Sequence, residues 1–319
     1  MKKVLILYGK KGVKRPPFEN DSYRISYEIL YALCEKRGIK MFRAPYQEYD
    51  HKKKYFKRAW FFDAKHKRWS ITKNVIPHLI FDKTAANSQA DCEKESIGKD
   101  YLFFNALEFS QLVRNKLAIS LLFSKWSKKS WLIENKRDLK KILLKITTGK
   151  LVIKPLRGGG GKNVQVLEKK DALKNARLKG TYLIQDYIDS SAGISGISKS
   201  MHDLRLVMIN DKIIYSFVRE PKAGCFLANC SQGGTLKIVP LKDIPRSVYP
   251  IISHATKMFN TFSPRFYSID LMFDKTKRPW VVELNAMPGL NICAKEEKPY
   301  ILRLYKELAK VFKAKAELC

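Results

Sequence analysis

Residues 266–290 read FYSIDLMFDKTKRPWVVELNAMPGL, and this stretch decides the fold. Two apolar runs typical of β-strands flank a short polar segment, which predicts a hairpin with a tight turn. The hairpin places Asp270 on one strand near Glu283 on the other. Because side chains alternate along a strand, Asn285 points to the same face as Glu283. Two carboxylates and an amide oxygen form a site suited to Mg²⁺, whereas any one of these acids alone would indicate an ordinary exposed hairpin.

The composition indicates a globular chain with a large excess of positive charge. Its 319 residues are 45% hydrophobic, and 62 Lys and Arg face 30 Asp and Glu, which gives a formal net charge of +32. No apolar run approaches the roughly 20 residues of a membrane helix, and the run at residues 4–8 is shorter than a secretory signal requires. The six cysteines include no CxxC pair, so we expect a reducing, cytoplasmic location without disulfides or zinc.

Three interpretations of the charge compete. It can attract an acidic macromolecule, either nucleic acid or an acidic polypeptide. It can line a site for phosphates and carboxylates, or it can be a solvated lysine-rich surface. The best candidate for a basic-aromatic patch is residues 51–69, where basic runs alternate with aromatic residues. The aromatic residues are Tyr55, Phe56, Trp60 and Trp69.

The rest of the chain alternates strand and helix patterns. A strand at residues 4–8, a helix at 20–37 and a strand at 39–42 predict a parallel α/β unit. Further helices are expected at residues 108–123, 171–178, 245–262 and 299–316. Further strands are expected at residues 151–154, 164–167, 182–188, 204–209 and 212–218, with a run at 75–81 that Pro77 weakens.

Residues 151–167 read LVIKPLRGGGGKNVQVL and combine a lysine with a glycine loop. Lys154 lies within an apolar strand, where an ammonium group needs an anionic partner. The four glycines that follow allow backbone N–H groups to approach a phosphate, although they also suit a flexible loop. They are Gly158, Gly159, Gly160 and Gly161. The spacing fits neither the Walker A nor the dinucleotide motif. The strand at 182–188 offers its backbone and Gln185 to an adenine, or is an ordinary strand.

Residues 202–234 carry a second set of polar groups. Asp203 and Arg205 open one predicted strand, and Arg219 closes its hairpin partner. Arginines bind carboxylates or phosphates bidentately, although these residues also suit a solvated surface hairpin. The stretch CFLANCSQGG follows and offers amide and backbone donors for an anion. These donors are Asn229, Gly233 and Gly234.

Taken in order, these motifs resemble the ATP-grasp superfamily, in the branch of glutathione synthetase and the RimK-type ribosomal-protein glutamate ligase. The resemblance covers about residues 105–290. It implies an α/β (α+β) ATP-grasp fold with a parallel α/β domain at residues 1–105. A small central lid subdomain at 106–188 and an antiparallel-sheet subdomain with the Mg²⁺ site at 189–319 would follow.

The resemblance also implies a role for each site residue. On the ATP phosphates it places Lys116, Lys154 and the loop Gly158, Gly159, Gly160 and Gly161. Around adenine and ribose it places Gln185, Asp186, Tyr187, Ile188, Asp189 and Met272. The ligands of two Mg²⁺ ions, for which Mn²⁺ can substitute, would be Asp270, Glu283 and Asn285. Arg205 and Arg219 would hold the acyl substrate or stabilise its acyl-phosphate, and Asp203, Asn229, Gly233 and Gly234 would contact the substrate. The chain departs from the family at Gln232, where an arginine is common, and Arg219 or Lys237 are candidates to supply that charge.

The implied activity is an ATP-dependent carboxylate–amine or thiol ligase that acts through an acyl-phosphate. Its substrate is left open between an acidic polypeptide extended by amino acids and a small dipeptide-type product. A kinase of the same fold is a third alternative. A different class is a basic nucleic-acid-binding protein with a regulatory or inactive nucleotide site, which the intact set Asp270, Glu283 and Asn285 disfavours. We expect no membrane partner, and a homo-oligomer is compatible with the family.

Overall fold

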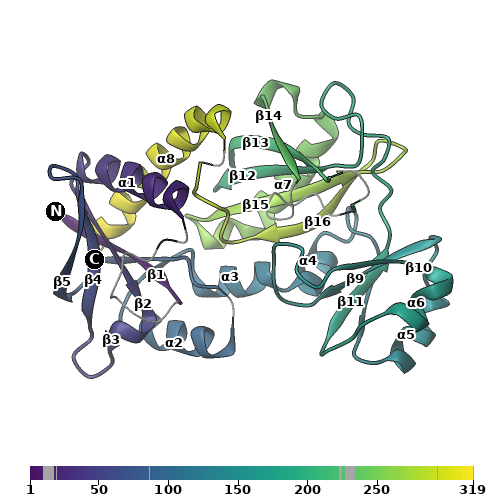
Figure 1. Cartoon of the computed structure of the whole chain (residues 1–319), viewed down its shortest axis with the longest axis horizontal. Coiled ribbons are helices and arrows are strands. Elements are labelled where there is room, and N and C mark those ends of the chain that lie inside the picture. The colour runs from purple at the N-terminus through teal and green to yellow at the C-terminus, as the bar shows by residue number, and fades with distance from the viewer. Residues whose placement is uncertain are drawn as a thin grey trace. The chain divides into compact units, whose positions relative to one another are not determined.

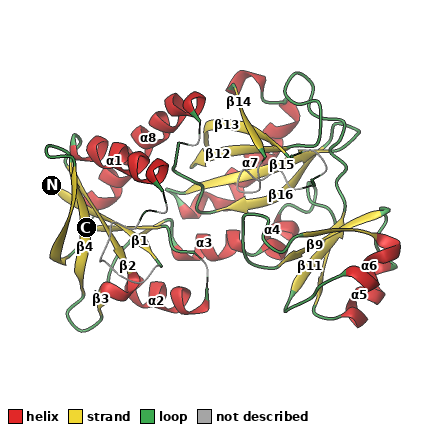
Figure 2. Ribbon diagram, viewed as in Figure 1, coloured by secondary structure: helices red, strands yellow, loops and turns green. Residues whose placement is uncertain are grey.

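The computed structural model describes residues 1–9, 18, 20–85, 87–222, 225–226, 234–292 and 294–318. The chain forms two compact units, each built from separate segments of sequence (Figures 1 and 2). Unit 1 comprises Met1–Phe109, Phe262–Phe266 and Met287–Cys319, and unit 2 comprises Ser110–Thr261 and Tyr267–Ala286. The predicted division into three domains at residues 105 and 188 stays a prediction. Among the described residues, no helix is long and apolar enough to cross a membrane.

Unit 1 is built on a mixed sheet with a parallel centre. Its strand order is β3-β4-β2-β1-β6-β7, and β5 pairs with β4. The strands are β1 (Lys2–Tyr8), β2 (Ile39–Pro45), β3 (Tyr49–Asp50), β4 (Tyr55–Asp63), β5 (Arg68–Val75), β6 (Leu79–Asp82) and β7 (Phe103–Phe104). Since β1 runs parallel to both β2 and β6, the predicted parallel α/β unit is confirmed. The run at residues 75–81 is not one strand, because β5 ends at Val75 and β6 begins after Pro77.

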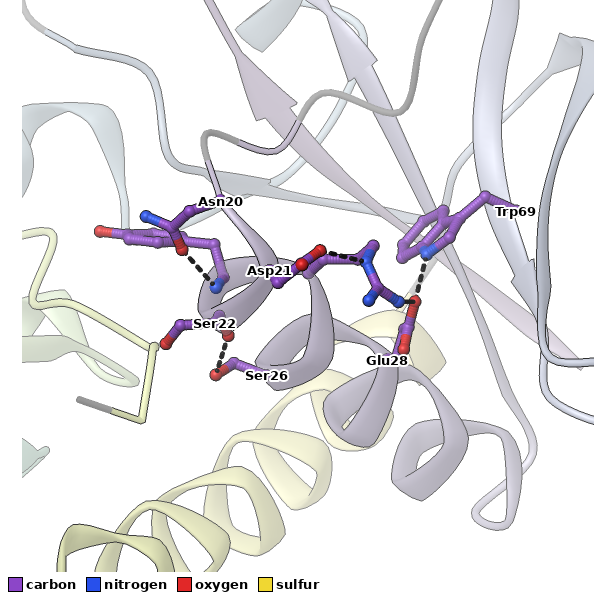
Figure 3. A network of polar contacts seen from close by, with 8 residues as sticks. Asn20, Asp21, Ser22, Ser26, Glu28 and Trp69 are labelled. Carbon is purple, nitrogen blue, oxygen red and sulfur yellow. Dashed lines mark hydrogen bonds and ion pairs between the residues drawn. The ribbon is translucent and has the colours of Figure 1, made fainter. Parts of the chain in front are cut away.

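Helices cover this sheet. They are α1 (Asp21–Glu35), α2 (Ser88–Gly98) and α8 (Lys298–Glu317), and α3 (Leu107–Arg114) leads out of the unit. Asn20 begins α1, because its side-chain oxygen accepts a hydrogen bond from the backbone N–H of Tyr23 at 3.0 Å (Figure 3). The C-terminal helix α8 packs on β1, β2, β6 and α1. Its Phe312 is fully buried and lies 5.1 Å, ring to ring, from Phe81 of β6.

The basic-aromatic segment at residues 51–69 forms a turn, strand β4, the next turn and the first two residues of β5. Its aromatic rings turn inward: Phe56 is fully buried and Trp60 is 7% exposed. The indole N–H of Trp69 is held by Glu28 at 2.9 Å (Figure 3). The rings of Phe56 and Trp60 are therefore part of the core and are not available to stack on nucleic-acid bases.

Unit 2 contains two antiparallel sheets. The four-stranded sheet has the order β10-β9-β11-β8, and the five-stranded sheet has the order β14-β13-β12-β15-β16. The strands are β8 (Ser130–Ile133), β9 (Lys150–Pro155), β10 (Gln165–Glu168), β11 (Tyr182–Asp186), β12 (Asp203–Ile209), β13 (Lys212–Glu220), β14 (Thr235–Val239), β15 (Phe266–Phe273) and β16 (Pro279–Asn285). The helices are α4 (Lys116–Leu122), α5 (Lys136–Leu143), α6 (Ala172–Asn175) and α7 (Tyr249–Phe259).

Two predicted helices differ from the structure. The helix expected at residues 108–123 is divided into α3 and α4, because the side chain of Asn115 accepts hydrogen bonds from the N–H groups of Leu117 and Ala118 at 3.1 and 3.2 Å. Asn115 thus caps a new helix, and this local bond outweighs continuation of the old one. The helix expected at 171–178 is a 3-10 turn at Lys169–Asp171 followed by the short α6.

The hairpin predicted from residues 266–290 is confirmed as β15 and β16. Asp270 is directly opposite Glu283, and Ser268 is opposite Asn285. The turn is closed by Asp274, whose carboxylate accepts hydrogen bonds from backbone N–H groups across it, including that of Arg278 at 3.2 Å. These bonds fix the turn, and a bulge between Asp270 and Leu271 shifts the register so that the two acids lie opposite each other.

Candidate active site

A pocket within unit 2 is lined by residues from both of its sheets. It encloses about 1040 Å³ of empty space, part of it open to solvent. Most residues that the sequence assigned to the nucleotide line it: Lys116, Lys154, Gly158, Gly159, Gly161, Gln185, Asp186, Tyr187, Ile188 and Met272. Glu283 from the predicted Mg²⁺ ligands and Asp203 from the predicted substrate contacts line it as well. The roles assigned to these residues remain proposals, but one cavity brings them together.

Two buried lysines form the basic part of the pocket. The ammonium group of Lys154 on β9 donates a hydrogen bond to the carbonyl oxygen of Val282 at 3.1 Å. Burial lowers the pKa of Lys154 to about 8, against the opposing charge of Glu283 and with a further lowering by Lys116. Burial also lowers the pKa of Lys116, and Glu283 opposes this shift. Two cations held in one poorly solvated place favour an anionic ligand between them.

The glycine loop lies next to the two lysines and contacts one of them directly. The ammonium group of Lys116 donates to the carbonyl oxygen of Gly158 at 2.7 Å. Gly158, Gly160 and Gly161 have φ values of +122°, +67° and +70°. A Cβ atom added at Gly158 or Gly160 would meet nothing within 4 Å. The loop therefore needs glycine for its backbone conformation and not for close packing.

Strand β11 forms the next wall, and its polar side chains are already engaged. The amide nitrogen of Gln185 donates to the hydroxyl of Ser130 at 2.5 Å and to the carbonyl oxygen of Lys128 at 3.3 Å. The carboxylate of Asp186 accepts hydrogen bonds from Thr147, including its backbone N–H at 2.8 Å. These side chains therefore hold the strand in position. A nucleotide base would form its hydrogen bonds with the backbone N–H and C=O groups of β11.

The carboxylate of Asp270 is enclosed by two arginines. Arg205 binds it bidentately, with Nε 2.6 Å from Oδ1 and Nη2 2.5 Å from Oδ2, and Arg219 Nη2 lies 3.0 Å from Oδ2. Burial opposes ionisation of Asp270, but the two arginines outweigh it and hold its pKa below the usual value. Arg219 also pairs with Asp203. Within the described part of the chain, Oδ1 of Asp203 is buried and has no hydrogen-bond partner.

The residues predicted to hold Mg²⁺ fit that ion in their chemistry. Asp270, Glu283 and Asn285 share one face of the β15–β16 hairpin and supply only oxygen ligands. Glu283 lines the pocket, and its carboxylate forms no hydrogen bond or ion pair with any described residue. No group of three or more His, Cys, Asp or Glu among the described residues is arranged to hold a metal ion. Glu283 is thus the uncommitted ligand of the set, and Asp270 the one already occupied.

Some assigned residues lie elsewhere, and some pocket residues were not predicted. Asn229 and Gly233 lie outside the described residues, and Gly234 is half-buried just before β14. Asp189 does not line the pocket and pairs with Lys275 at 2.8 Å, which together with Ser191 holds its pKa at about 2. The pocket-lining residues that the sequence did not single out include Lys128, Val152, Met201, Phe226 and Val281. Lys128 lies 3.7 Å from the centre of the Trp280 ring, and no local motif marks that contact.

The fold and the site together define an ATP-grasp protein. The RimK-like ATP-grasp domain matches residues 113–303, and the chain belongs to this family. Its relatives include a probable alpha-L-glutamate ligase of Coxiella burnetii, 28% identical over 186 residues, which are 56% of this chain and 57% of the relative. The chain thus matches little more than half the length of that relative.

Solved structures of the same fold extend over nearly the whole chain. The D-cycloserine synthetase DcsG aligns with a TM-score of 0.63 at 14% identity and covers 97% of this chain and 99% of its own. The ATP-grasp ligase PsnB, in complex with a minimal precursor, aligns with a TM-score of 0.60 at 12% identity and covers 99% and 100%. These likenesses confirm the predicted ATP-grasp fold class.

Proposed function

We propose that this chain is an ATP-dependent ligase that joins a carboxylate to an amine through an acyl-phosphate. The observation that carries the proposal is the arrangement in the unit 2 pocket. Buried Lys116 and Lys154 lie there with the uncommitted carboxylate of Glu283 and a glycine loop whose backbone is held by Lys116. Lysines, a glycine loop and an acid on one cavity are the groups that phosphoryl transfer needs for binding and charge neutralisation.

The reaction would proceed in two balanced steps. A substrate carboxylate oxygen attacks the γ-phosphorus of ATP, the bond to the bridging oxygen breaks, and ADP leaves. An amine then attacks the acyl carbon, loses a proton, and releases inorganic phosphate. Lys116 and Lys154 would hold the phosphates, and the glycine loop would exclude water from the acyl-phosphate. Mg²⁺ held by Glu283, Asn285 and Asp270 would neutralise phosphate charge.

Arg205 and Arg219 would act on the acyl-phosphate. Both are anchored by Asp270, and both remain cationic in the protein. An anchored guanidinium provides a preorganised positive charge, which stabilises a developing anion at little cost in reorganisation. Gln232, at the position where the family often carries arginine, lies outside the described residues. Arg219 and Lys237 stay the candidates for that charge, and the ammonium group of Lys237 donates to the carbonyl oxygen of Ile197 at 3.3 Å.

The substrate class we favour is an amino acid added to a peptide or acidic polypeptide. A relative is named a probable alpha-L-glutamate ligase, and PsnB was solved with a precursor. The net charge of +32 supports an acidic acceptor, because opposite charge accelerates and strengthens association. A small dipeptide-type product is the alternative, and DcsG, a D-cycloserine synthetase, has the same fold.

The test is ADP and phosphate release with Mg²⁺ and ATP in the presence of L-glutamate, with and without an acidic polypeptide, followed by mass spectrometry. We expect release that requires two substrates and a product heavier by one condensation. A polypeptide product supports the favoured class, and a dipeptide supports the alternative. A stable phosphorylated product without free phosphate would instead establish a kinase. The Glu283→Ala variant is the control, and turnover that survives in it would contradict the site assignment.

A further inference from the structure

In unit 1, charged residues lie at the carboxyl ends of the parallel strands β1, β2 and β6. The chain passes from β1 through α1 to β2 on one side, and later places β6 on the other side of β1. In open α/β sheets, ligands bind outside the carboxyl ends of the strands at such a reversal of order. Tyr8 ends β1, Arg43 lies near the end of β2, and Lys83 directly follows β6.

Arg43 is a buried arginine that has no carboxylate partner among the described residues. It is only 9% exposed, and its Nε and Nη1 atoms are buried without a hydrogen-bond acceptor. Its guanidinium carbon lies 4.8, 5.1 and 4.6 Å from the ring centres of Tyr8, Phe18 and Tyr27. Aromatic faces attract a cation but do not accept its in-plane N–H bonds. Two strong donors are thus left open, which native proteins rarely tolerate without a function.

The buried carboxylates of the same region are committed to other residues. Glu48, whose charge acts on Tyr8 together with that of Arg43, is bound bidentately by Arg58 at 3.0 and 2.7 Å. Asp82 accepts a hydrogen bond from Lys94 at 3.3 Å. Within the described ranges, neither Glu48 nor Asp82 is thus paired with Arg43.

Lys83 adds a second cation to this place. Its ammonium group donates to the carbonyl oxygen of Pro288 at 2.6 Å, an acceptor without formal charge. Burial lowers the pKa of Lys83 to about 7; the negative charge of Asp82 opposes the shift, and the positive charge of Arg43 adds to it. An anion between Arg43 and Lys83 would remove this repulsion.

Neutral donors lie near Arg43. The hydroxyls of Tyr8 and Tyr31 and the indole N–H of Trp60 are buried without partners among the described residues. Trp60 lies directly across the β2–β4 ladder from Arg43. Burial raises the pKa of Tyr31, and Arg43 opposes the shift, so this hydroxyl lies within the field of the arginine. These three groups can each donate a hydrogen bond to an anion, whereas Oε1 of Gln47 is a buried acceptor without a partner among the described residues.

The aromatic wall beside Arg43 is held in place by α1. Trp69 packs on Phe18 and Tyr31, with ring centres 4.8 and 5.1 Å away. Its indole N–H donates to Glu28, which also accepts from Arg24 at 2.8 Å (Figure 3). Phe18, one of the three rings that contact Arg43, is thus packed against a tryptophan whose own position is fixed by a hydrogen bond.

We propose that Arg43 and Lys83 form an oxyanion-binding site in unit 1 that takes the carboxylate of an amino-acid-sized ligand. A guanidinium binds a carboxylate bidentately, and the rings around it provide apolar contact for the carbon chain of the ligand. Inorganic phosphate could satisfy the cations but has no carbon chain. The site is independent of the proposed ligation, since it involves no residue of the unit 2 pocket.

The test is titration of the full chain, without nucleotide or Mg²⁺, with sodium L-glutamate, sodium phosphate or sodium chloride at equal ionic strength. The pH is about 6, where Lys83 is protonated. The readout is the arginine Nε–H signal of Arg43 in the NMR spectrum, identified by its loss in Arg43→Lys. We expect a saturable shift with glutamate. We expect the dissociation constant from calorimetry to rise about tenfold in Arg43→Lys and Lys83→Met, as loss of one charge-assisted hydrogen bond predicts.

Arg58→Lys is the matched control, because Arg58 belongs to the same sheet and its guanidinium already binds the carboxylate of Glu48. Its glutamate affinity should equal that of the wild type. Saturation by phosphate alone would overturn the assignment to a carboxylate. A shift that chloride reproduces, or equal glutamate affinity in Arg43→Lys and the wild type, would overturn the site. Because no ATP is present, failure here is separate from failure of the ligase assay.

Discussion

Raising the pH from about 7 to about 9 should weaken ATP binding about tenfold, because Lys154 loses its proton over this range. Burial lowers the pKa of Lys154 to about 8. With that value, roughly nine-tenths of the molecules carry the ammonium group at pH 7 and roughly one-tenth at pH 9. If only the charged form binds the phosphates, the affinity falls in the same ratio, or by about 1.4 kcal/mol.

This loss of binding would not come from unfolding. The pKa of Lys154 in the folded chain lies below the value of about 10.4 that an unfolded chain has. Between these values the unfolded chain binds more protons, so the contribution of Lys154 to stability rises as the pH increases through this window. Binding and stability therefore move in opposite directions above pH 8, and one experiment can separate them.

Calorimetry of ATP binding at three pH values, in two buffers of different ionisation enthalpy, measures both the affinity and the protons taken up. We expect uptake of about half a proton near pH 8 and nearly one near pH 9, because phosphate contact restores the charge of Lys154. Lys154→Met should abolish most of the pH dependence, whereas Lys145→Met, which removes an exposed lysine outside the pocket, should keep it. A flat affinity and no proton uptake between pH 7 and pH 9 would refute the placement of Lys154 on the phosphates.

Three further predictions test the pocket. Glu283→Ala should abolish turnover of Mg²⁺–ATP and leave the urea unfolding midpoint nearly unchanged, since its carboxylate bonds no described residue; wild-type turnover would contradict the metal assignment. Gly158→Ala should raise the KM for ATP, because its φ of +122° costs about 1–3 kcal/mol in any other residue, whereas Gly159→Ala should be nearly neutral. Equal KM values in the two variants would refute the conformational argument. Asn115→Ala should lower the free energy of unfolding by about 1 kcal/mol through loss of the α4 cap, and Asn115→Asp should retain it.

The strands that carry the site could be predicted because their signals are local. In β15 and β16 an apolar alternation flanks a polar turn, and the turn length sets which residues face each other. That rule places Asp270 near Glu283, but by turn length alone Asp270 would face Val282. A bulge between Asp270 and Leu271 shifts the register and brings Asp270 opposite Glu283. The same holds for the β12–β13 hairpin, whose turn contains Asn210 at a φ of +52°. Local backbone chemistry alone determines these elements.

The helix break at Asn115 was missed for a physical reason. The apolar periodicity of α3 and α4 is compatible with one continuous helix, and periodicity does not register a competing side-chain bond. Asn115 followed by Lys116 is a capping signal, and reading it would have divided the segment. The break matters to the site, because it places Lys116 in the first turn of α4.

No sequence pattern predicts which residues pair with Asp270. Arg205 and Arg219 are 65 and 51 residues away along the chain and reach Asp270 because β12, β13 and β15 lie in one sheet. Likewise, whether Arg43 finds a carboxylate among the described residues depends on which acids other cations already bind. Which charged side chains pair depends on how all the strands are arranged in the sheet, so composition and sequence spacing alone do not predict these ion pairs.

The arginines around Asp270 limit how a metal and a substrate can enter. The oxygens of Asp270 already accept hydrogen bonds from Arg205 and Arg219. A divalent cation at that carboxylate would lie beside two guanidinium groups, and like charges at such distances repel strongly where water is scarce. Mg²⁺ therefore needs anionic oxygens from the ligand to offset the arginines. It follows that metal and phosphate should bind together, and that Glu283, free of such partners, is the ligand a metal meets first.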